Sequence, residues 1–507
     1  MKIFLVGMMG AGKTTIARML GEILSIDSID MDTEIEKAEG RSISEIFCKD
    51  GEAHFRRIES ALLKQLVEKD GSFIVSTGGG IVLSDENRVL LKDEKVIYLK
   101  VLPDELKKRV QLENRPLLAN DKTRIDEIYE RRKGLYEEFE MLDSTYLSEW
   151  ETVAKVLYML ESKDVDIVGN VKVDSEVQDV RIEPFGLKKL PTDAYVFTCD
   201  KIEQLYGEFL PVKRFVLPNG EVAKDISHVL DAYEYLLTND VTRGDLLIGV
   251  GGGTVTDFTG FVGSTYKRGM NFAFYPTTLL ASIDAAIGGK NGIDFSKYKN
   301  VVGTINLPAH VIVDPICLIS LPQETFIEGL IEGYKMALIS GGRFYDWFLN
   351  NLEAVLKRNL KVLSAFIEMA VEEKLEIVAK DLKETSIRSY LNLGHTFGHA
   401  FESITGLPHG LSVGWGLYKE LEYFKMMGYL NAMDCQEMQD VLKMLLPEKI
   451  KEMCTDSIDT AFKEEMKRYM TNDKKTQKSG KVRMPILRGP GKVSLEEIYI
   501  RDLLSTV

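Results

Sequence analysis

The feature that most constrains the fold of this chain is a glycine-rich loop close to its first residue. The apolar run KIFLV is followed by GMMGAGKT at residues 7–14 and then by the helical pattern TIARMLGEIL. In such a strand–loop–helix setting, backbone N–H groups of the loop can surround the phosphates of a nucleotide at a helix N-terminus. Lys13 supplies a positive charge, and the hydroxyl of Thr14 is a ligand for Mg²⁺. The loop therefore predicts a nucleotide-binding domain.

Length and composition indicate a multidomain globular protein. The chain has 507 residues, which suggests about two to four domains, and its 45% hydrophobic and 28% charged residues are typical of globular proteins. A net charge of −14 disfavours nucleic acid as a partner. No apolar run reaches the roughly eighteen residues of a membrane span. The five scattered cysteines form no CxxC pair, so we expect a cytoplasmic protein without disulfides or a thiolate zinc site.

The pattern along the chain divides it into three parts. Up to about residue 160, strand-like runs such as FIVSTGG and KVIYLKV alternate with charged helical segments, as in a parallel sheet covered by helices. Strand-like runs return between about 190 and 310, and the pattern beyond about 320 is mostly helical. We predict an α/β fold with domain boundaries at 1–162, 163–318 and 319–507.

Charged and glycine residues downstream of the loop indicate which kind of molecule accepts the phosphoryl group. SIDMD places Asp30 and Asp32 at the end of the next strand, where one carboxylate can hold Mg²⁺ and the other a hydroxyl group. Three adjacent glycines in VSTGGG offer a backbone surface that no side chain blocks. The further candidates are Arg56 and Glu59 in EAHFRRIE, Arg115 in ENRPLL and Arg132 in YERRKGLY.

Taken in this order, these residues resemble the shikimate kinase family over residues 1–160. The resemblance implies phosphorylation of shikimate by ATP, with Mg²⁺ held by Thr14 and Asp30. An anionic acceptor suits guanidinium partners, while Lys13 and Arg115 offset charge on the transferring phosphoryl group. The implied ATP-binding set is Gly7, Gly10, Ala11, Gly12, Lys13, Thr14, Thr15, Arg109 and Arg115, and the implied shikimate-binding set is Asp32, Arg56, Gly78, Gly79, Gly80 and Arg132.

A second glycine-rich turn follows the strand-like run DLLIGV. It places Gly251–Gly253 and then Asp257 in VGGGTVTD, which is not the GxGxxG fingerprint, and a triple glycine after a strand is often only a tight turn. Glu221 and Lys224 in PNGEVAKD can reach the ribose and phosphates of a cofactor bound there. Polar residues then recur among small ones, and this mixture suits a pocket for a phosphorylated, hydroxyl-rich molecule. They are Arg268, Asp284, Lys290, Lys299 and Asn300.

Three of the six histidines fall within residues 395–409 and predict a metal site. Glu332 and Lys335 lie one helical turn apart in GLIEGYKMALI. Glu332, His395 and His409 offer one carboxylate and two imidazoles, which is a catalytic zinc arrangement with open positions for substrate oxygens. His395 and His399 share a helical face, but the segment is not HExxH and does not indicate a metallopeptidase.

From about residue 190 onward the chain resembles the 3-dehydroquinate synthase family. The family's PTTLLA…D…GGK block, Glu-x-x-Lys helix, RxxLNxGHTFGHAxE segment and HG block occur in order. The resemblance implies zinc, or another divalent ion such as Co²⁺, at Glu332, His395 and His409, with Lys335, His399 and Glu384 as catalytic residues. The implied NAD-binding set is Glu221, Lys224, Gly251, Gly252, Gly253, Asp257, Thr277, Thr278, Lys290 and Lys299, and the implied substrate set is Arg268, Asp284, Lys290, Asn300, Lys335, Lys374, Arg388, Asn392 and one of Lys474 and Lys475.

The two resemblances together predict a bifunctional enzyme with an N-terminal kinase and a C-terminal synthase. The synthase reaction converts 3-deoxy-D-arabino-heptulosonate 7-phosphate to 3-dehydroquinate and phosphate, with NAD recycled. The resemblance also implies a homodimer through the synthase half, with Arg268 reaching a neighbouring subunit. Two alternatives stay open: the second half is a related NAD and zinc enzyme, such as another sugar-phosphate cyclase or a polyol-phosphate dehydrogenase, or one half is a degenerate binding module.

Two departures from the synthase family are visible in the sequence. Residues 164–190 lack a clear version of its first strands, and Gly333 interrupts the Glu-x-x-Lys helix. A glycine inside a helix costs about 0.5–1 kcal/mol relative to alanine, so we expect different local packing there.

Overall fold

A computed structural model describes residues 1–110, 121–160, 169–296, 298–384, 386–455, 460–472 and 480–506. The chain divides into two compact units, the first comprising Met1–Ile167 with Leu356–Lys361 and the second Val168–Val355 with Val362–Val507. The predictions for Arg115, Lys474 and Lys475 lie outside the described residues.

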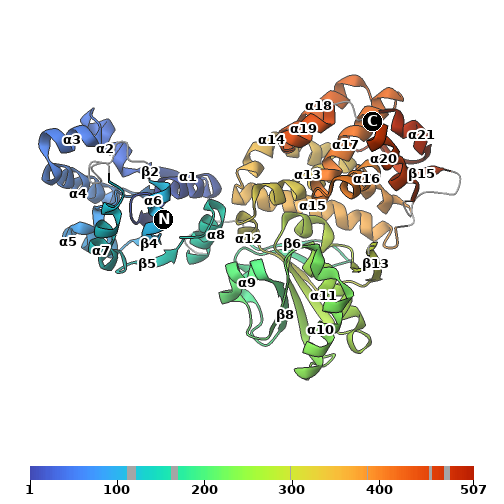
Figure 1. Ribbon diagram of the computed structural model, residues 1–507, viewed down its shortest axis with the longest axis horizontal. Coiled ribbons are helices and arrows are strands. Elements are labelled where there is room, and N and C mark those ends of the chain that lie inside the picture. The colour runs from blue at the N-terminus through green and yellow to red at the C-terminus, as the bar shows by residue number, and fades with distance from the viewer. Residues whose placement is uncertain are drawn as a thin grey trace. The chain divides into compact units, whose positions relative to one another are not determined.

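The first unit is a five-stranded parallel sheet covered by helices (Figure 1). Its strand order is β2-β3-β1-β4-β5, and the central strands are buried, as expected for a parallel sheet with helices on its faces. The strands are β1 (Lys2–Val6), β2 (Asp27–Asp30), β3 (Phe73–Ser76), β4 (Lys95–Lys100) and β5 (Glu140–Asp143). The helices are α1 (Lys13–Leu24), α2 (Met31–Glu39), α3 (Ile43–Asp50), α4 (Glu52–Glu68), α5 (Asp85–Lys92), α6 (Pro103–Arg109), α7 (Arg124–Tyr136) and α8 (Glu149–Met159).

This topology brings the predicted kinase residues to one edge of the sheet. The phosphate loop follows β1, Asp30 is the last residue of β2, and the three glycines of VSTGGG follow β3. Because β1, β2 and β3 are parallel neighbours, these segments all leave the sheet at its carboxyl edge, where ligands bind in α/β folds.

The second unit begins with a seven-stranded sheet in the order β6-β7-β14-β11-β10-β8-β9, parallel except for β6 against β7. The strands are β6 (Val171–Val173), β7 (Val180–Ile182), β8 (Tyr195–Cys199), β9 (Arg214–Leu217), β10 (Leu246–Gly251), β11 (Asn271–Pro276) and β14 (Val311–Val313). The helices α9 (Asp200–Tyr206), α10 (Ile226–Thr238) and α11 (Gly253–Thr265) accompany them. An antiparallel hairpin, β12 (Lys290–Phe295) and β13 (Tyr298–Ile305), interrupts this pattern within the polar stretch of the sequence.

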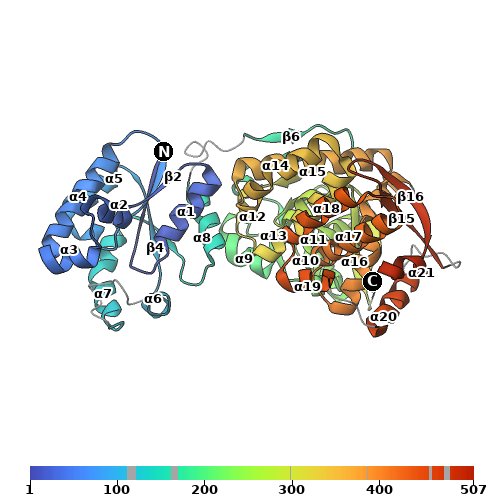
Figure 2. The ribbon, with the colours of Figure 1, turned by 90° about the horizontal axis from the view of Figure 1, so that it is seen from above.

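The rest of the second unit is helical, as predicted, with one antiparallel hairpin near the C-terminus (Figure 2). None of the described helices is both long enough and apolar enough to cross a membrane. The elements are α12 (Pro315–Ile319), α13 (Gln323–Ser340), α14 (Gly342–Leu356), α15 (Leu360–Lys380), α16 (His395–Thr405), α17 (His409–Met426), α18 (Ala432–Leu445), α19 (Glu448–Thr455), α20 (Thr460–Asn472), β15 (Lys481–Leu487), β16 (Val493–Tyr499) and α21 (Ile500–Leu503).

Glycines bring α13, α16 and α17 unusually close together. A methyl group at Gly410 on α17 would lie 2.6 Å from the Cα of Glu328 on α13, and one at Gly398 on α16 would lie 3.0 Å from the Cα of Val413 on α17. Nonbonded carbon atoms normally approach to about 3.5–4.0 Å, so these helix contacts require glycine. Gly333 has the same explanation, since a methyl group there would overlap the ring of Phe366.

Candidate active sites

The phosphate loop of the first unit has the backbone shape that its glycines allow. Gly10 and Gly12 adopt left-handed φ angles of 81° and 88°. Lys13 is buried and donates hydrogen bonds to the carbonyl oxygens of Gly7 at 2.9 Å and Met8 at 3.1 Å. Its ammonium group is thereby held within the loop, where a phosphate would be bound.

The predicted magnesium ligands of this loop lie in direct contact. The Thr14 hydroxyl donates to Oδ2 of Asp30 at 2.6 Å, and the Asp30 Oδ1 accepts from the backbone N–H of Thr33 at 3.0 Å. Burial alone would raise the pKa of Asp30, but the hydrogen bonds from Thr14 and Thr33 hold it below its ordinary value. The site thus keeps a carboxylate beside a hydroxyl, which is a donor set that suits Mg²⁺.

The predicted acceptor residues converge around the glycines that follow β3. Arg132 donates to the Gly79 carbonyl oxygen at 2.6 Å. A methyl group at Gly80 would overlap the Arg56 guanidinium, and one at Gly78 would lie 3.0 Å from Oδ1 of Asp32. Two arginines and a carboxylate therefore face one small backbone surface. Such a site suits a small ring that carries a carboxylate and hydroxyl groups.

Two further residues support these arginines. Glu59, fully buried, forms an ion pair of 2.6 Å with Arg56, and burial raises the pKa of its carboxyl group. Tyr136 was not predicted from the sequence, although it lies four residues after Arg132 on α7. Its hydroxyl donates at 2.5 Å to the same Gly79 carbonyl that Arg132 contacts. Arg109, a predicted ATP contact, donates to the Thr145 carbonyl oxygen at 2.8 Å.

In the second unit, the predicted cofactor residues surround Lys224. This buried lysine donates to Oδ2 of Asp257 at 2.8 Å and to Oδ1 of Asn300 at 3.0 Å, and it lies 3.3 Å from Oε1 of Glu221. Burial raises the pKa of Asp257 to about 6 against the opposing effect of Lys224. Asn300, predicted as a substrate contact, is thus hydrogen-bonded to a residue of the predicted cofactor set.

The glycine turn and the threonines lie at neighbouring strand ends. Gly251 ends β10, and its carbonyl accepts from the backbone N–H of Thr277, just after β11, at 2.9 Å. A methyl group at Gly252 would lie 3.0 Å from the methyl of Thr278. Among the described residues, the buried Thr277 hydroxyl has no hydrogen-bond partner. An unpaired hydroxyl beside the N-terminus of α11 fits the phosphates of a dinucleotide.

The predicted substrate residues form two linked groups of charges. Lys374 forms an ion pair with Asp284, and the charges of Lys374 and Lys335 lower the pKa of Asp284 although its burial would raise it. Lys290 forms an ion pair with Glu384, which also accepts from the amide of Asn392 at 2.9 Å. Arg388, also predicted, donates to the backbone carbonyls of Leu382 at 2.6 Å and Gly288 at 3.1 Å.

The predicted metal ligands converge from α13, α16 and α17. Nε2 of His395 lies 3.9 Å and Nε2 of His409 lies 3.8 Å from Oε1 of Glu332. His399 belongs to the same cluster, because one ring nitrogen from each of the three histidines lies within 4.8 Å of the others. Glu332 is fully buried and pairs with Lys335 through Oε2, while its Oε1 has no hydrogen-bond partner among the described residues. A divalent cation would satisfy this oxygen together with the two imidazoles.

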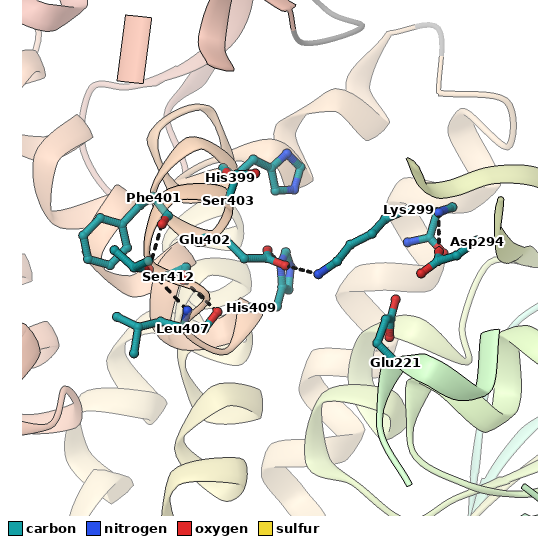
Figure 3. A network of polar contacts seen from close by, with 12 residues as sticks. Glu221, Asp294, Lys299, His399, Phe401, Glu402, Ser403, Leu407, His409 and Ser412 are labelled. Carbon is teal, nitrogen blue, oxygen red and sulfur yellow. Dashed lines mark hydrogen bonds and ion pairs between the residues drawn. The ribbon is translucent and has the colours of Figure 1, made fainter. Parts of the chain in front are cut away.

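Two predicted residues lie elsewhere in the second unit. Arg268 is exposed on the short turn Tyr266–Arg268, and no hydrogen bond or ion pair links it to another predicted residue within the described part of the chain. Lys299, predicted to bind the cofactor, forms an ion pair of 2.8 Å with Glu402 (Figure 3). Glu402 itself was not among the predicted site residues.

Comparison with known proteins gives matches over both units. The chain matches the shikimate kinase family over residues 9–161, the 3-dehydroquinate synthase N-terminal family over 214–328 and the C-terminal family over 329–476. It is 44% identical over 508 residues to the bifunctional shikimate kinase/3-dehydroquinate synthase of Thermotoga maritima, which covers 100% of both chains. It is also 34% identical over 319 residues to the 3-dehydroquinate synthase of Teredinibacter turnerae, covering 62% of this chain and 83% of that protein.

A solved structure resembles the second unit. It is ValA, the 2-epi-5-epi-valiolone synthase of Streptomyces hygroscopicus subsp. jinggangensis with NAD⁺ and Zn²⁺ bound. The similarity has a TM-score of 0.58 at 25% identity and covers 66% of this chain and 97% of that chain.

Proposed function

We propose roles for the residues of both sites from the premise that this chain belongs to the family of bifunctional shikimate kinase/3-dehydroquinate synthases. The enzyme phosphorylates shikimate with ATP, and it converts 3-deoxy-D-arabino-heptulosonate 7-phosphate to 3-dehydroquinate and phosphate. The observation that carries the role assignments is that, within each unit, predicted residues distant in sequence converge in space.

In the kinase, the phosphate loop and Lys13 hold the β- and γ-phosphates of ATP, and Thr14 and Asp30 hold Mg²⁺. Asp32, Arg56 and Arg132 bind shikimate against the backbone of Gly78–Gly80. The two guanidinium groups recognise the carboxylate, and Asp32 accepts a hydrogen bond from a ring hydroxyl. The contacts of Arg132 and Tyr136 with Gly79 fix this surface before substrate arrives.

In the synthase, NAD⁺ supplies a reversible hydride acceptor and Zn²⁺, or Co²⁺, a Lewis acid when bound. Glu332, His395 and His409 hold the metal, and Lys224 and Asp257, with the glycine turn at 251–253, hold the dinucleotide. His399, whose ring lies in the same cluster as the metal ligands, transfers protons next to the metal. The charges of Lys290, Lys374 and Arg388 bind the carboxylate and phosphate of the substrate.

The alternative functions are less well supported. The full-length relative at 44% identity carries both activities in its name, whereas the 2-epi-5-epi-valiolone synthase ValA is 25% identical. Neither unit has lost a polar residue that its chemistry requires within the described residues. A polyol-phosphate dehydrogenase would release one NADH per turnover, and this outcome distinguishes it from a synthase that recycles NAD⁺.

The test is phosphate release from 3-deoxy-D-arabino-heptulosonate 7-phosphate with trace NAD⁺ and no ATP. We expect release far in excess of the NAD⁺ supplied, and its loss on chelation. Lys13→Ala should abolish shikimate phosphorylation and spare phosphate release, whereas Glu332→Ala should do the reverse. Loss of both activities in either folded variant would contradict the assignment of each set of residues to its own site.

We also propose a homodimer in which Arg268 enters the neighbouring subunit's synthase site. Two observations support this proposal. Arg268 is exposed, and in the described part of the chain it forms no hydrogen bond or ion pair with this chain's own predicted substrate residues. Mixing Arg268→Ala and Glu332→Ala subunits tests the proposal, because a mixed dimer would regain one site with both residues intact. We expect recovery of synthase activity that neither variant has alone. No recovery in verified mixed dimers would contradict it.

A further inference from the structure

The two histidines proposed as metal ligands, His395 and His409, contact different hydrogen-bond acceptors through Nδ1. Nδ1 of His395 lies 3.2 Å from the backbone oxygen of Leu393, and Nδ1 of His409 lies 2.9 Å from Oε2 of Glu402. Carbonyl and carboxylate oxygens only accept hydrogen bonds, so Nδ1 carries the proton in both rings. In both rings Nε2 is the nitrogen on the side of Glu332, at 3.9 Å and 3.8 Å from its Oε1.

Glu402 is also contacted by Lys299, through the carboxylate oxygen that His409 does not use. Its Oε1 accepts from Nζ of Lys299 at 2.8 Å, and the side chain of Glu402 is 17% exposed. Figure 3 shows Lys299 extending toward Glu402, with the His409 ring next to that carboxylate. Glu402 lies two helical turns after His395 on α16, whereas Lys299 belongs to β13 of the hairpin in the α/β part. The contacts therefore run from β13 through α16 to the first residue of α17.

We propose that Glu402 is a positioning residue for the metal ligand His409 and that Lys299 holds Glu402 in place. This inference rests on the proposed metal site at Glu332, His395 and His409. The carboxylate fixes the tautomer and the orientation of the imidazole, and it increases the electron density that Nε2 offers a cation.

An ordinary surface ion pair does not account for this arrangement. The Lys299 side chain is 61% exposed, and exposed ion pairs contribute little to stability. Glu402 contacts the imidazole through Oε2 and Lys299 through Oε1, so the contact with His409 does not depend on the oxygen that Lys299 uses. The effect of Glu402 should therefore appear in metal binding and exceed that of Lys299.

The test is the Zn²⁺ dissociation constant of the full chain, measured by competition with a chromophoric chelator. Loss of an outer carboxylate typically weakens metal binding about 10- to 100-fold, and we expect this for Glu402→Ala. Glu402→Gln keeps an acceptor oxygen without the charge, so its binding should be intermediate. Lys299→Met should weaken binding by at most about fivefold, since only the exposed ion pair is lost.

The matched control is Glu376→Ala, which removes a carboxylate from an exposed ion pair with Lys380 on α15. It should bind Zn²⁺ as the wild type does. The absorption spectrum of bound Co²⁺ gives a second readout, because a displaced His409 would change the coordination geometry and hence the visible bands. Unfolding curves of the metal-free proteins show whether each variant folds, and Glu402→Gln carries the test if Glu402→Ala does not.

Two results would overturn the inference, and they are distinguishable. Wild-type protein that binds no Zn²⁺, or whose binding survives Glu332→Ala, would overturn the proposed metal site together with this inference. Wild-type binding that Glu332→Ala abolishes, with unchanged affinity and Co²⁺ spectrum in folded Glu402 variants, would overturn the inference alone.

Discussion

Replacing Gly410 by alanine should move the metal ligands apart without changing any of them. The added methyl group would lie 2.6 Å from both the Cα and the backbone oxygen of Glu328 on α13. Carbon atoms not bonded to each other approach to about 3.5–4.0 Å, so α17 would have to shift by roughly 1 Å. Both obstructing atoms belong to the backbone of a helix, and no side-chain rotation can relieve the overlap.

The size of the effect follows from the distance between ligand atoms. A tetrahedral Zn²⁺ with bonds of about 2.1 Å holds its ligand atoms roughly 3.4 Å apart. In this structure Nε2 of His409 is 3.8 Å from Oε1 of Glu332, which a small adjustment can close. A further shift of about 1 Å would put the imidazole out of reach, because metal sites tolerate deviations of only about 0.2 Å. We expect at least about a tenfold loss of Zn²⁺ affinity, and a loss of about 1–3 kcal/mol in unfolding free energy from overpacking.

Chelator competition and urea unfolding of the metal-free protein measure the two effects separately. Gly134→Ala is the matched control, since Gly134 is a helical glycine of α7 with no atom within 4 Å of an added methyl group. That change should stabilise the first unit by about 0.5–1 kcal/mol and leave Zn²⁺ binding unaltered. A Gly410→Ala protein with wild-type affinity and wild-type stability would refute the claim that this contact sets the helix spacing.

Three other perturbations have defined outcomes. Tyr136→Phe removes one of two hydrogen bonds to Gly79, so the KM for shikimate should rise several-fold while the KM for ATP stays constant; equal changes in both would argue against a local role. Metal removal should lower the unfolding temperature of the second unit only, and Zn²⁺ at 100 times its dissociation constant should restore about 2.7 kcal/mol; a simultaneous shift of the first unit would contradict this. Because burial raises the pKa of Asp257 from 3.8 to about 6, the native state binds more protons than the unfolded state between these values, and this group lowers stability as pH rises through that window. Asp257→Asn should remove that contribution, at most about 3 kcal/mol, from the difference in unfolding free energy between pH 4 and pH 6 measured by urea unfolding. The same pH dependence of the unfolding free energy in both proteins would disprove it.

The sequence predicted the parts of the fold that local patterns encode. Apolar runs mark the buried strands of both parallel sheets, and glycine turns mark the points where β1 and β10 end. The β12–β13 hairpin was missed because β13 is exposed along nearly its whole length and has no apolar alternation to reveal it. The β15–β16 hairpin near the C-terminus was missed as well, within a region whose pattern is mostly helical.

The candidate site residues also fall into two groups, those predicted from local motifs and those whose contacts are visible only in the structure. Charged residues inside recognisable motifs, such as Glu332 and His395, were predicted together and lie together. Glu402 lies in the same histidine segment, but sequence spacing alone cannot tell that its carboxylate points at His409 on the next helix. Lys299 was predicted as a cofactor contact, and its partner in the structure is Glu402, because the hairpin that carries it leads toward α16.

The glycines of the helical part show why the packing around the site could not be predicted from the sequence. Gly333 departs from the synthase family's helix and weakens helix propensity, yet the structure fills its position with the ring of Phe366. Gly398 and Gly410 are likewise poor helix formers, and they lie at the points where α16, α17 and α13 come into close contact. The sequence alone shows that such glycines lower helix propensity. Their stabilising effect on the site depends on how the three helices pack, which the sequence alone does not show. That effect is the approach of two imidazoles, His395 and His409, to within 4 Å of the carboxylate of Glu332.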